Sequence, residues 1–442
     1  MRNKGKIIFI GLGIIFGLVF SYSRAYADVF DVYGCGARGM AMGNSLVTLV
    51  DDPCALYYNP ARAPMIDQFF VVGYNGVWDQ LYIDTQNPDT KPSSDIPNTQ
   101  GVVVGLASGL GIPKFRLGAL IYSPVNRLQL QHSYYTDAKE YYLTNRLYFS
   151  LVGDVTQVQT IIVGGGYQLF PSLSLGLGFS ISIMTHLMES VYQPKFFDEN
   201  EIYVNMNSYQ SNEVSPVLGF YFGASQMIRL GVSYRGSSVF PIKGEARVRV
   251  GGINDPLNPD DYFTQKIDSY LFYSPDKISG SVGLIFSPTL SLELGIDWFR
   301  WSGYRNTQNV SISAEDDPPV RDSANLRAGI EKQDEKERRF WAGLIYAPSP
   351  IPSQARIQNL VDNDRLAFSF GVGYPLKFLG KTIRGDLGCQ WQHLFGRSVT
   401  KIGDPNSYDA DPYTEGVQNP GYPGYSSGGN LIAVQTTVNY NF

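Results

Sequence analysis

The feature that most constrains this chain is a strict two-residue alternation of apolar with small or polar side chains. The clearest instance is the segment 173–183, where Leu, Phe and Ile occupy one face and Ser and Gly occupy the other. Successive side chains of a β-strand point to opposite faces, so this period predicts a strand. The same alternation recurs at residues 290–298, 383–391 and 432–442. The chain is therefore expected to be all-β.

The lengths of the strands and of their connections favour a membrane barrel over a soluble β-sandwich. The alternating segments have the length that a tilted strand needs to cross a bilayer, about 9 to 11 residues or slightly more. Charged residues such as Glu293 and Asp386 lie opposite the apolar faces and would point into a lumen. Short connections at 111–113, 169–172, 225–226 and 287–289 alternate with long polar ones at 79–99, 126–156, 187–212, 252–273, 303–321 and 398–429. This asymmetry is typical of outer-membrane barrels.

Pairing the segments across these connections predicts an antiparallel barrel of fourteen strands with both ends on the periplasmic side. A further segment, residues 141–152, also resembles a strand, but including it would make the number odd. We therefore expect it to belong to a structured outer loop. The fourteen strands are predicted near residues 67–78, 100–110, 114–124, 157–168, 173–186, 213–224, 227–250, 275–286, 290–302, 322–332, 338–348, 364–374, 382–396 and 430–442.

The two ends of the chain predict export to the outer membrane. Basic residues precede an apolar run at 7–20, and Ala25-Tyr26-Ala27 provides small residues for signal peptidase. This run is shorter than the roughly 20 residues of a membrane-spanning helix, so residues 1–27 are expected to be a cleaved signal peptide. No second long apolar stretch follows. The terminal aromatic Phe442 is the kind of residue that the outer-membrane assembly machinery recognises.

Charge and composition exclude several classes of function. Without residues 1–27, 31 basic side chains face 40 acidic ones, which argues against a nucleic-acid partner. The three histidines, His132, His186 and His393, are far apart and match no Ser/His or metal-ligand pattern. We therefore expect a protein that is not an enzyme and has no cofactor or metal site. Cys35 and Cys54 flank one short segment and could pair in an oxidising periplasm, a question that the sequence leaves open.

Residues 28–66 do not alternate, and they are rich in glycine at Gly34, Gly36, Gly39 and Gly43. Glycine allows close approach of two backbones or a positive φ, as a compact plug inside a lumen would require. The segment also matches G-x-G-x-x-G, the pattern of a phosphate-binding loop. However, no strand precedes it and no βαβ unit follows, so a nucleotide site is not expected. We predict an N-terminal hatch at 28–66 and a barrel at 67–442.

Two motifs in this segment resemble the start of the outer-membrane long-chain fatty acid and hydrocarbon transporters of the FadL/TodX type. They are G-x-G-x-x-G-M-A-M-G and V-D-D-P-x-A-L-Y-Y-N-P-A, which ends on Asn59, Pro60 and Ala61. The resemblance implies a 14-stranded barrel plugged by an N-terminal hatch that ends near the Asn-Pro-Ala motif. Weaker matches extend along the barrel. Arg62 departs from the family pattern, because Gly or Leu usually follows this motif.

The resemblance also implies a route for a hydrophobic substrate: capture by outer loops, descent to a pocket above the hatch, and sideways exit through a gap in the wall. Loops 187–212 and 252–274 would form the capture groove. Arg384 and Arg327 are candidates to meet a carboxylate in the lumen, although an ion pair of Arg384 with Asp386 is the simpler expectation. The apolar residues of the two loops are Leu187, Met188, Tyr192, Phe196, Phe197, Tyr262, Phe263, Tyr270 and Leu271.

Three functions compete at this point. Uptake of hydrophobic compounds, either long-chain fatty acids or aromatic hydrocarbons, is the leading one. A barrel of the same superfamily that serves as a shuttle or anchor for secreted proteins is the second, and a general porin or adhesin is the third. The expected partners are outer-membrane lipid and lipopolysaccharide, a hydrophobic small molecule and the outer-membrane assembly machinery, and the protein is expected to be a monomer.

Overall fold

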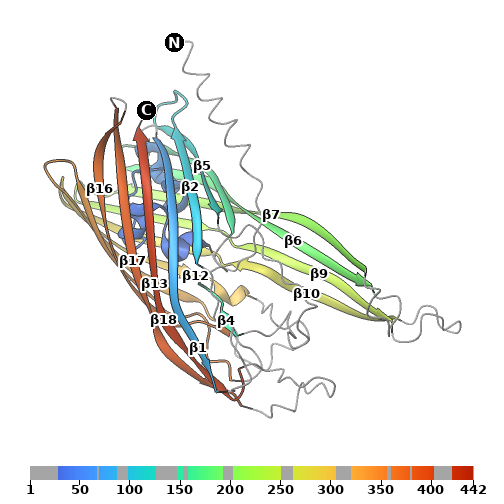
Figure 1. The fold of residues 1–442 in the computed structure, drawn as a ribbon. Coiled ribbons are helices and arrows are strands. Elements are labelled where there is room, and N and C mark those ends of the chain that lie inside the picture. Colours follow the sequence, from blue (N-terminus) through green and yellow to red (C-terminus); the bar gives the residue numbers. More distant parts are fainter. Residues whose placement is uncertain are drawn as a thin grey trace.

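Fourteen antiparallel strands close into a barrel in the computed structural model, as the sequence predicts (Figure 1). The structure describes residues 28–66, 69–86, 98–125, 147–152, 158–192, 203–249, 262–304, 320–355, 360–378, 381–402 and 421–441. The first strand pairs with the last along its whole length, from Phe69 opposite Asn441 to Thr85 opposite Tyr425. The barrel strands are β1 (Phe69–Thr85), β2 (Thr99–Ser108), β3 (Phe115–Pro124), β5 (Gln159–Phe170), β6 (Leu173–Tyr192), β7 (Tyr203–Gly223), β8 (Ile228–Arg235), β11 (Lys277–Ser287), β12 (Leu290–Phe299), β13 (Ser323–Gln333), β14 (Arg339–Ala347), β16 (Arg365–Phe378), β17 (Lys381–Thr400) and β18 (Gly424–Asn441).

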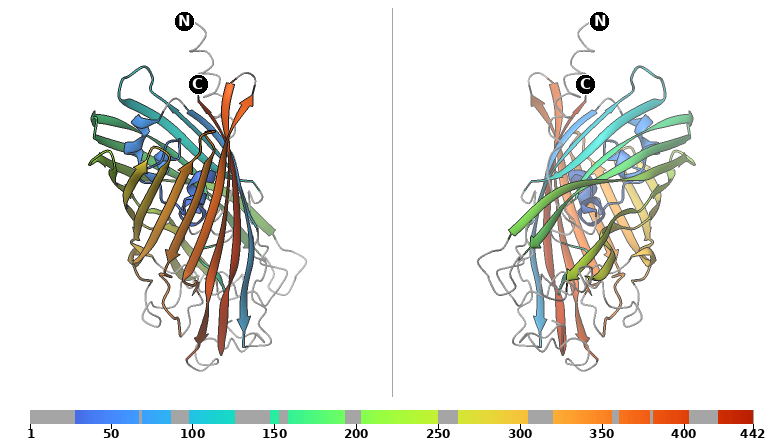
Figure 2. Two further views of the ribbon diagram at one scale, coloured as in Figure 1. Left: turned by 90° about the vertical axis from the view of Figure 1, so that its left-hand side faces the viewer. Right: turned by 90° about the vertical axis from the view of Figure 1, so that its right-hand side faces the viewer.

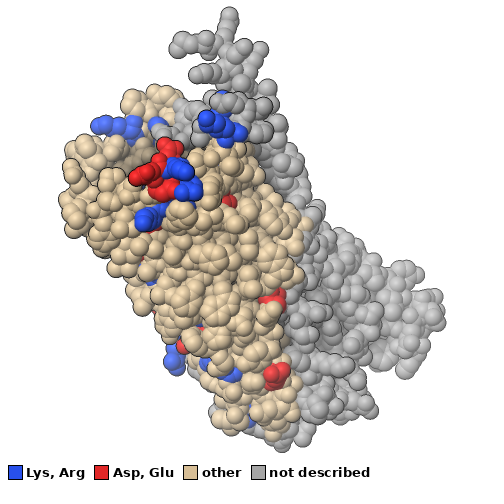
Figure 3. All heavy atoms as spheres, turned by 60° about the vertical axis from the view of Figure 1, so that its left-hand side comes forward, with Lys and Arg blue, Asp and Glu red and all other residues tan. Residues whose placement is uncertain are grey.

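The alternation of the sequence sorts side chains between the two faces of the wall. In β6, Leu175, Leu177 and Phe179 are exposed on the outside, whereas Ser174 and Ser180 are buried on the lumen side. The outside is therefore apolar over the height of the strands, as contact with lipid requires. Figure 3 shows a broad uncharged surface, with most of the visible charged side chains near its two ends. Among the described residues, no helix is both long and apolar enough to cross a membrane.

The segment 227–250, predicted to be one strand, is divided into two, so that expectation is wrong. The strand β8 ends at Arg235, and β9 (Ser238–Arg249) pairs with β10 (Tyr262–Ser274) in a separate two-stranded sheet. Pro216 of β7 lies opposite the break and has no N–H to donate; Gly236 N donates to its carbonyl oxygen at 2.9 Å. The ladder between β7 and β8 consequently stops at Val217 and Arg235.

Part of the segment 141–152 lies within the described residues. A short strand, β4 (Tyr148–Phe149), pairs in parallel with β15 (Leu360–Val361) outside the barrel sheet. Leu147, Phe149 and Val152 are buried in the same apolar cluster as the N-terminal segment. This stretch therefore contributes no barrel strand and packs into the core.

Residues 28–66, which we call the hatch, lie inside the barrel (Figure 2). Four short helices form it: α2 (Val29–Tyr33), α3 (Gly36–Ala41), α4 (Ala55–Tyr58) and the 3-10 helix η1 (Pro60–Met65). Side chains set two of the helix starts: Asp28 accepts from Phe30 N, and Asn59 accepts from Ala61 N. Nearly every residue of the hatch is buried, so the core of the molecule is the hatch together with the lumen face of the wall.

Candidate functional site

A ring of glycines on the lumen face of the wall brings strand backbone against hatch backbone. A Cβ atom added to Gly176 would lie 2.2 Å from Ala61 N, and one added to Gly343 would lie 2.1 Å from Gly43 N. Both distances are too short for any side chain. Eleven strands each present a glycine whose added Cβ atom would lie within 3.1 Å of a hatch atom; we call these residues the glycine ring, and they are Gly105, Gly118, Gly166, Gly176, Gly219, Gly231, Gly283, Gly329, Gly343, Gly371 and Gly388.

The Asn-Pro-Ala motif binds the hatch to β7. The side-chain amide of Asn59 donates to the carbonyl oxygens of Val47 and Phe220, both at 3.0 Å, and its oxygen accepts from Ala61 N. Pro60 packs on the glycine ring at Gly176. The motif therefore joins two parts of the hatch to β6 and β7 of the wall.

Arg62, which departs from the family pattern, extends the same attachment. Its Nε donates to the carbonyl oxygen of Val50 at 3.2 Å. Its guanidinium lies 4.8 Å from the ring centre of Tyr221, a buried residue of β7, in a cation–π contact.

The predicted glycines of the hatch are required by its own geometry. Gly34 and Gly36 have positive φ values of +90° and +75°, which favour glycine. A Cβ atom on Gly39 would meet the Tyr58 hydroxyl at 2.3 Å. The segment 34–39 thus packs directly against α4.

One buried carboxylate of the wall binds hatch backbone. Glu293 of β12 is fully buried and accepts from Thr48 N, Thr48 Oγ1 and Leu49 N, the last two at 2.8 and 3.0 Å. Backbone N–H groups pointing at one carboxylate satisfy a charge that would otherwise be costly to bury.

A first ionic cluster joins the hatch to the wall near the short turns of the barrel. Arg38 pairs with Asp51 at 2.8 Å and with Glu331 at 2.7 Å, and Arg339 pairs with Asp51 at 2.6 Å. Burial opposes ionisation of Asp51, but the surrounding guanidinium groups hold its pKa well below the usual range. We call these residues, together with Arg384 and Asp386, the turn-side cluster.

A second cluster lies toward the long connections, and we call it the loop-side cluster. Arg235 pairs with Asp28 at 2.9 Å and also with Asp31; Lys277 pairs with Asp31 at 2.8 Å. Asp297 pairs with both Lys277 and Arg327. Burial raises the pKa of Asp28, whereas the adjacent Arg235 and Lys277 outweigh burial and lower the pKa of Asp31. Three cations therefore face three carboxylates, two of which belong to the hatch.

The lumen next to the loop-side cluster holds a cavity of about 40 Å³ between the hatch and the loops. Asp28, Asp31 and Val32 of the hatch line one side of it, and Phe299 and Trp301 of the wall line another. A ligand pocket usually has about 300 to 1,000 Å³. The space suits a water molecule and is smaller than a ligand pocket.

A larger cavity, of about 560 Å³, lies at the outer rim of β13, β14, β16 and β17. Arg321 and Arg397 contribute cations, and Pro350, Ile351 and Phe395 contribute apolar surface. A register shift in β17 between Leu394 and Arg397 precedes the last of these cations. This rim cavity is amphipathic and open to the outside.

The lumen cations predicted from sequence occupy different settings. Arg384 donates to both carboxylate oxygens of Asp386 at 3.0 Å and lies 4.0 Å from Asp51 in the turn-side cluster. Arg327 is buried in the loop-side cluster and donates to the carbonyl oxygen of Asn44 at 3.0 Å. Both are therefore engaged with the hatch or its neighbours.

Where the structure describes them, the two segments predicted to be capture loops are largely strands, so the expectation of irregular loops is wrong, while their part in substrate capture stays a prediction. Leu187, Met188 and Tyr192 belong to β6, which continues to pair with β7 as far as Tyr192 opposite Tyr203. Tyr262, Phe263, Tyr270 and Leu271 belong to β10. Phe196 and Phe197 lie outside the described residues. The sequences of these segments show no sustained apolar alternation, so these strands were not predicted.

Sequence reasoning missed the residues that hold the hatch most directly, namely Arg235, Lys277 and Glu293. Their alternation places them on the lumen face, but nothing in a single sequence shows which lumen residues meet the hatch. In the described parts of the chain, no three His, Cys, Asp or Glu side chains are grouped so as to hold a metal ion.

Solved structures similar to this one share its fold across nearly the whole chain. A Pseudomonas aeruginosa FadL homologue matches with a TM-score of 0.59 and 16% identity, covering 96% of this chain and all of that one. The Pseudomonas putida toluene transporter TodX matches at 0.56 and 14%, covering 93% and 99%. The Ralstonia pickettii toluene transporter TbuX matches at 0.54 and 14%, covering 94% and 100%.

Sequence comparison identifies the family. No curated protein matches the chain significantly. The family model described as outer membrane protein transport protein (OMPP1/FadL/TodX) matches residues 19–442. The chain therefore belongs to the OMPP1/FadL/TodX family of outer-membrane transport proteins.

Proposed function

We propose that the protein is a channel for uptake of hydrophobic compounds across the outer membrane, and that the hatch closes it. The fit between hatch and wall carries this proposal: the glycine ring, Glu293 and the two ionic clusters all bind residues 28–66. A general porin needs an open lumen, and a barrel that only presents loops to a secreted protein needs no such closure. The uptake channel accounts for the hatch, so the role of shuttle or anchor is not favoured.

The character of the lumen supports an apolar substrate. Leu81 and Ile83 of β1, Leu394 of β17 and Leu431 of β18 pack in the same apolar cluster as the hatch. Transfer of apolar surface from water to such a lining is favourable by about 25 cal/mol per Å². The solved relatives named as toluene transporters indicate the same class of substrate. The space beside the hatch is too small for one, so hatch or loop residues must move to admit it.

The charge balance of the loop-side cluster distinguishes acidic from neutral substrates. Arg235 and Lys277 are already neutralised by Asp28 and Asp31. A fatty acid carboxylate could bind there only by replacing one of these carboxylates, which would release α2 from the wall. A neutral hydrocarbon has no such exchange available and would depend on apolar contacts alone.

We propose a position for the sideways exit from the pairing of the strands. Beside Asn59 the ladders of β5, β6, β7 and β8 are unbroken. The ladder ends instead at Pro216 and Gly236, next to Arg235, where β8 gives way to β9. We therefore assign the exit to this break rather than to the wall beside Asn59.

Uptake by cells that express the protein tests the proposed function. Labelled oleate, toluene and arabinose are supplied separately to expressing cells and to cells with an empty vector. We expect faster accumulation of one or both apolar compounds and no change for arabinose. Oleate uptake without toluene uptake would indicate the carboxylate exchange; the reverse would indicate apolar contacts alone.

A folded barrel must be demonstrated in the same membranes. Heat-modifiable migration on a gel shows that the barrel has assembled. An assembled barrel that admits arabinose, or that admits none of the three compounds, would refute the proposal.

A further inference from the structure

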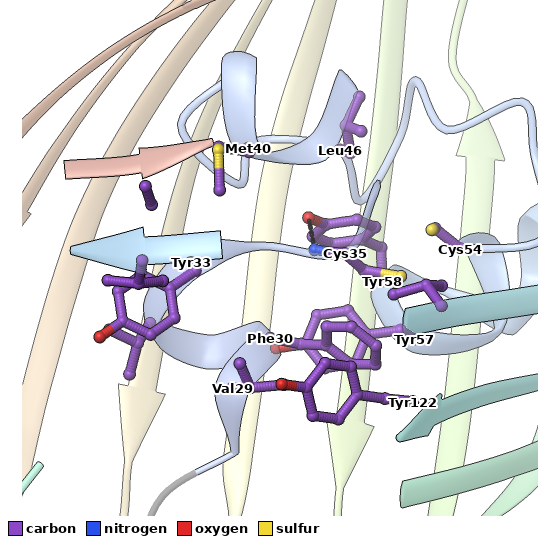
Figure 4. Close-up of a cluster of buried hydrophobic side chains, with 14 of the residues drawn as sticks. Val29, Phe30, Tyr33, Cys35, Met40, Leu46, Cys54, Tyr57, Tyr58 and Tyr122 are labelled. Atoms are coloured by element: carbon purple, nitrogen blue, oxygen red, sulfur yellow. Dashed lines mark hydrogen bonds between the residues drawn. The ribbon is translucent and has the colours of Figure 1, made fainter. Parts of the chain in front are cut away.

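Two buried cysteines of the hatch lie side by side at the starts of α3 and α4. Cys35 precedes α3 and Cys54 precedes α4, and each is 1% exposed. Both are free thiols in this structure. A Cβ atom on Gly36 would lie 3.1 Å from Cys54 Sγ, so this sulfur rests on the backbone next to Cys35. Figure 4 shows both side chains in one buried cluster together with Tyr58.

Independent hydrogen bonds fix the backbone on both sides of this pair. Cys35 N donates to the Tyr58 hydroxyl at 2.9 Å, and that hydroxyl donates to Asn44 Oδ1 at 3.2 Å. Cys54 N donates to Asp52 Oδ1 at 2.8 Å. The two sulfur atoms are therefore brought together by contacts that do not involve them.

We propose that Cys35 and Cys54 form a disulfide bond that staples the hatch. The two thiols lose two protons and two electrons as the S–S bond forms, and a protein disulfide of the periplasmic thiol-oxidising machinery is reduced to a dithiol by exchange through a mixed disulfide. A chain bound for the outer membrane passes through this oxidising compartment, where such bonds form and persist.

Burial places the reaction before the hatch is packed. Exchange needs a thiolate that the oxidant can reach, and both sulfur atoms are enclosed in the folded protein. Burial also raises the pKa of the Cys35 and Cys54 thiols, which keeps them protonated once they are enclosed. The bond therefore forms while the N-terminal segment is still accessible, and the finished barrel then protects it from reductants.

The proposed disulfide bond constrains one part of the hatch, and helix α2 lies outside that part. The bond encloses residues 35–54, which include α3, most of the contacts with β12 and the Asp51 carboxylate. Helix α2 lies outside the closed loop, and it carries Asp28 and Asp31 of the loop-side cluster. Displacement of the hatch by a substrate would therefore begin at α2, while residues 35–54 move as one body.

Counting of thiols in isolated outer membranes tests the bond. Samples are quenched in acid, denatured and treated with a maleimide polymer that adds a fixed mass to each free thiol. We expect one modified cysteine, Cys389, without reductant, and three after reduction of the denatured chain. Three modified cysteines without reductant would overturn the proposal.

Variants assign the bond to this pair. Cys54→Ser should free the partner, so that two thiols react without reductant, whereas Cys389→Ser should leave none. If Cys54→Ser does not assemble, mass spectrometry of the unreduced wild-type protein decides, because a cross-linked peptide pair containing Cys35 and Cys54 must be present. Reductant applied to the folded barrel should leave the bond intact. These measurements do not depend on substrate uptake, so the outcome is separate from that of the proposed function.

Discussion

At the scale of single residues, Gly343 illustrates how the wall holds the hatch by lacking side chains. A methyl group here would lie 2.1 Å from Gly43 N, and the nearest atoms are all backbone, which cannot rotate away. We predict that Gly343→Ala displaces the hatch, at a cost of about 1 to 3 kcal/mol for overpacking. Conductance of the purified protein in planar bilayers should rise severalfold.

Gly280 in β11 provides the matched control for this substitution. It lies in a barrel strand as well, but a Cβ atom added to it meets nothing within 4 Å. Gly280→Ala should therefore leave the conductance at the wild-type level. Equal conductance of the two variants would contradict the role assigned to the glycine ring.

Asp51 allows a prediction about pH. Its pKa in the folded protein lies below the ordinary value of 3.8, so its ion pairs add stability at pH values above 3.8. This contribution is lost only as the pH falls through the lowered pKa. Conductance should consequently stay low from about pH 7 to about pH 5.

Asp51→Asn removes the same attraction at every pH, although Glu331 still pairs with Arg38 and Asp386 still pairs with Arg384. Its conductance should exceed that of the wild type at both pH values, with faster hydrogen exchange in residues 48–51. An increase in wild-type conductance between about pH 7 and about pH 5 would contradict the assignment of Asp51 to hatch closure.

At the scale of elements, Pro216 sets where β7 and β8 part. We predict that Pro216→Val supplies the missing N–H toward Gly236 and lengthens the ladder at the break that we assign to the exit. Uptake of the preferred apolar compound should fall severalfold, while bilayer conductance stays low.

Pro375 in β16 is the control, since it also lies within a paired strand, opposite Arg384. Pro375→Val should leave uptake unchanged. If Pro216→Val transports as fast as the wild type in an assembled barrel, the exit lies elsewhere.

The elements also show how far sequence alone reaches. Strands with an apolar outer face, such as β6 and β12, are visible as alternation and were predicted close to their observed bounds. The outer part of β6 and the whole of β10 were not, because their side chains carry no apolar period. Helices α2 to α4 escape prediction for a related reason: each is one or two turns long and forms because the lumen encloses it.

At the scale of the whole molecule, the strands themselves pair into a closed wall. The seam between β1 and β18 consists of backbone pairing over seventeen residues. We predict that deletion of residues 29–65 leaves a heat-modifiable barrel that conducts steadily and admits arabinose. The sequence predicts this division into hatch and barrel, which the deletion tests. It could not show the ionic clusters, because Arg235 and Asp31 are separated by about two hundred residues and meet only in the folded chain.

The outcome for the deletion variant separates two views of the N-terminal segment. A barrel that fails to assemble would mean that the hatch is needed for folding. An assembled barrel that stays closed to arabinose would mean that the loops, including residues 147–152, are sufficient to close it.

The glycine ring has a consequence for how such a channel can be altered. The shape of the hatch is matched in the wall by glycines, which lack side chains, on eleven strands that are distant in sequence. A hatch taken alone from another barrel would meet a lumen face whose glycines and larger side chains stand at other positions. Transfer of specificity from one barrel to another therefore requires the hatch and the lumen face of the wall to be moved together.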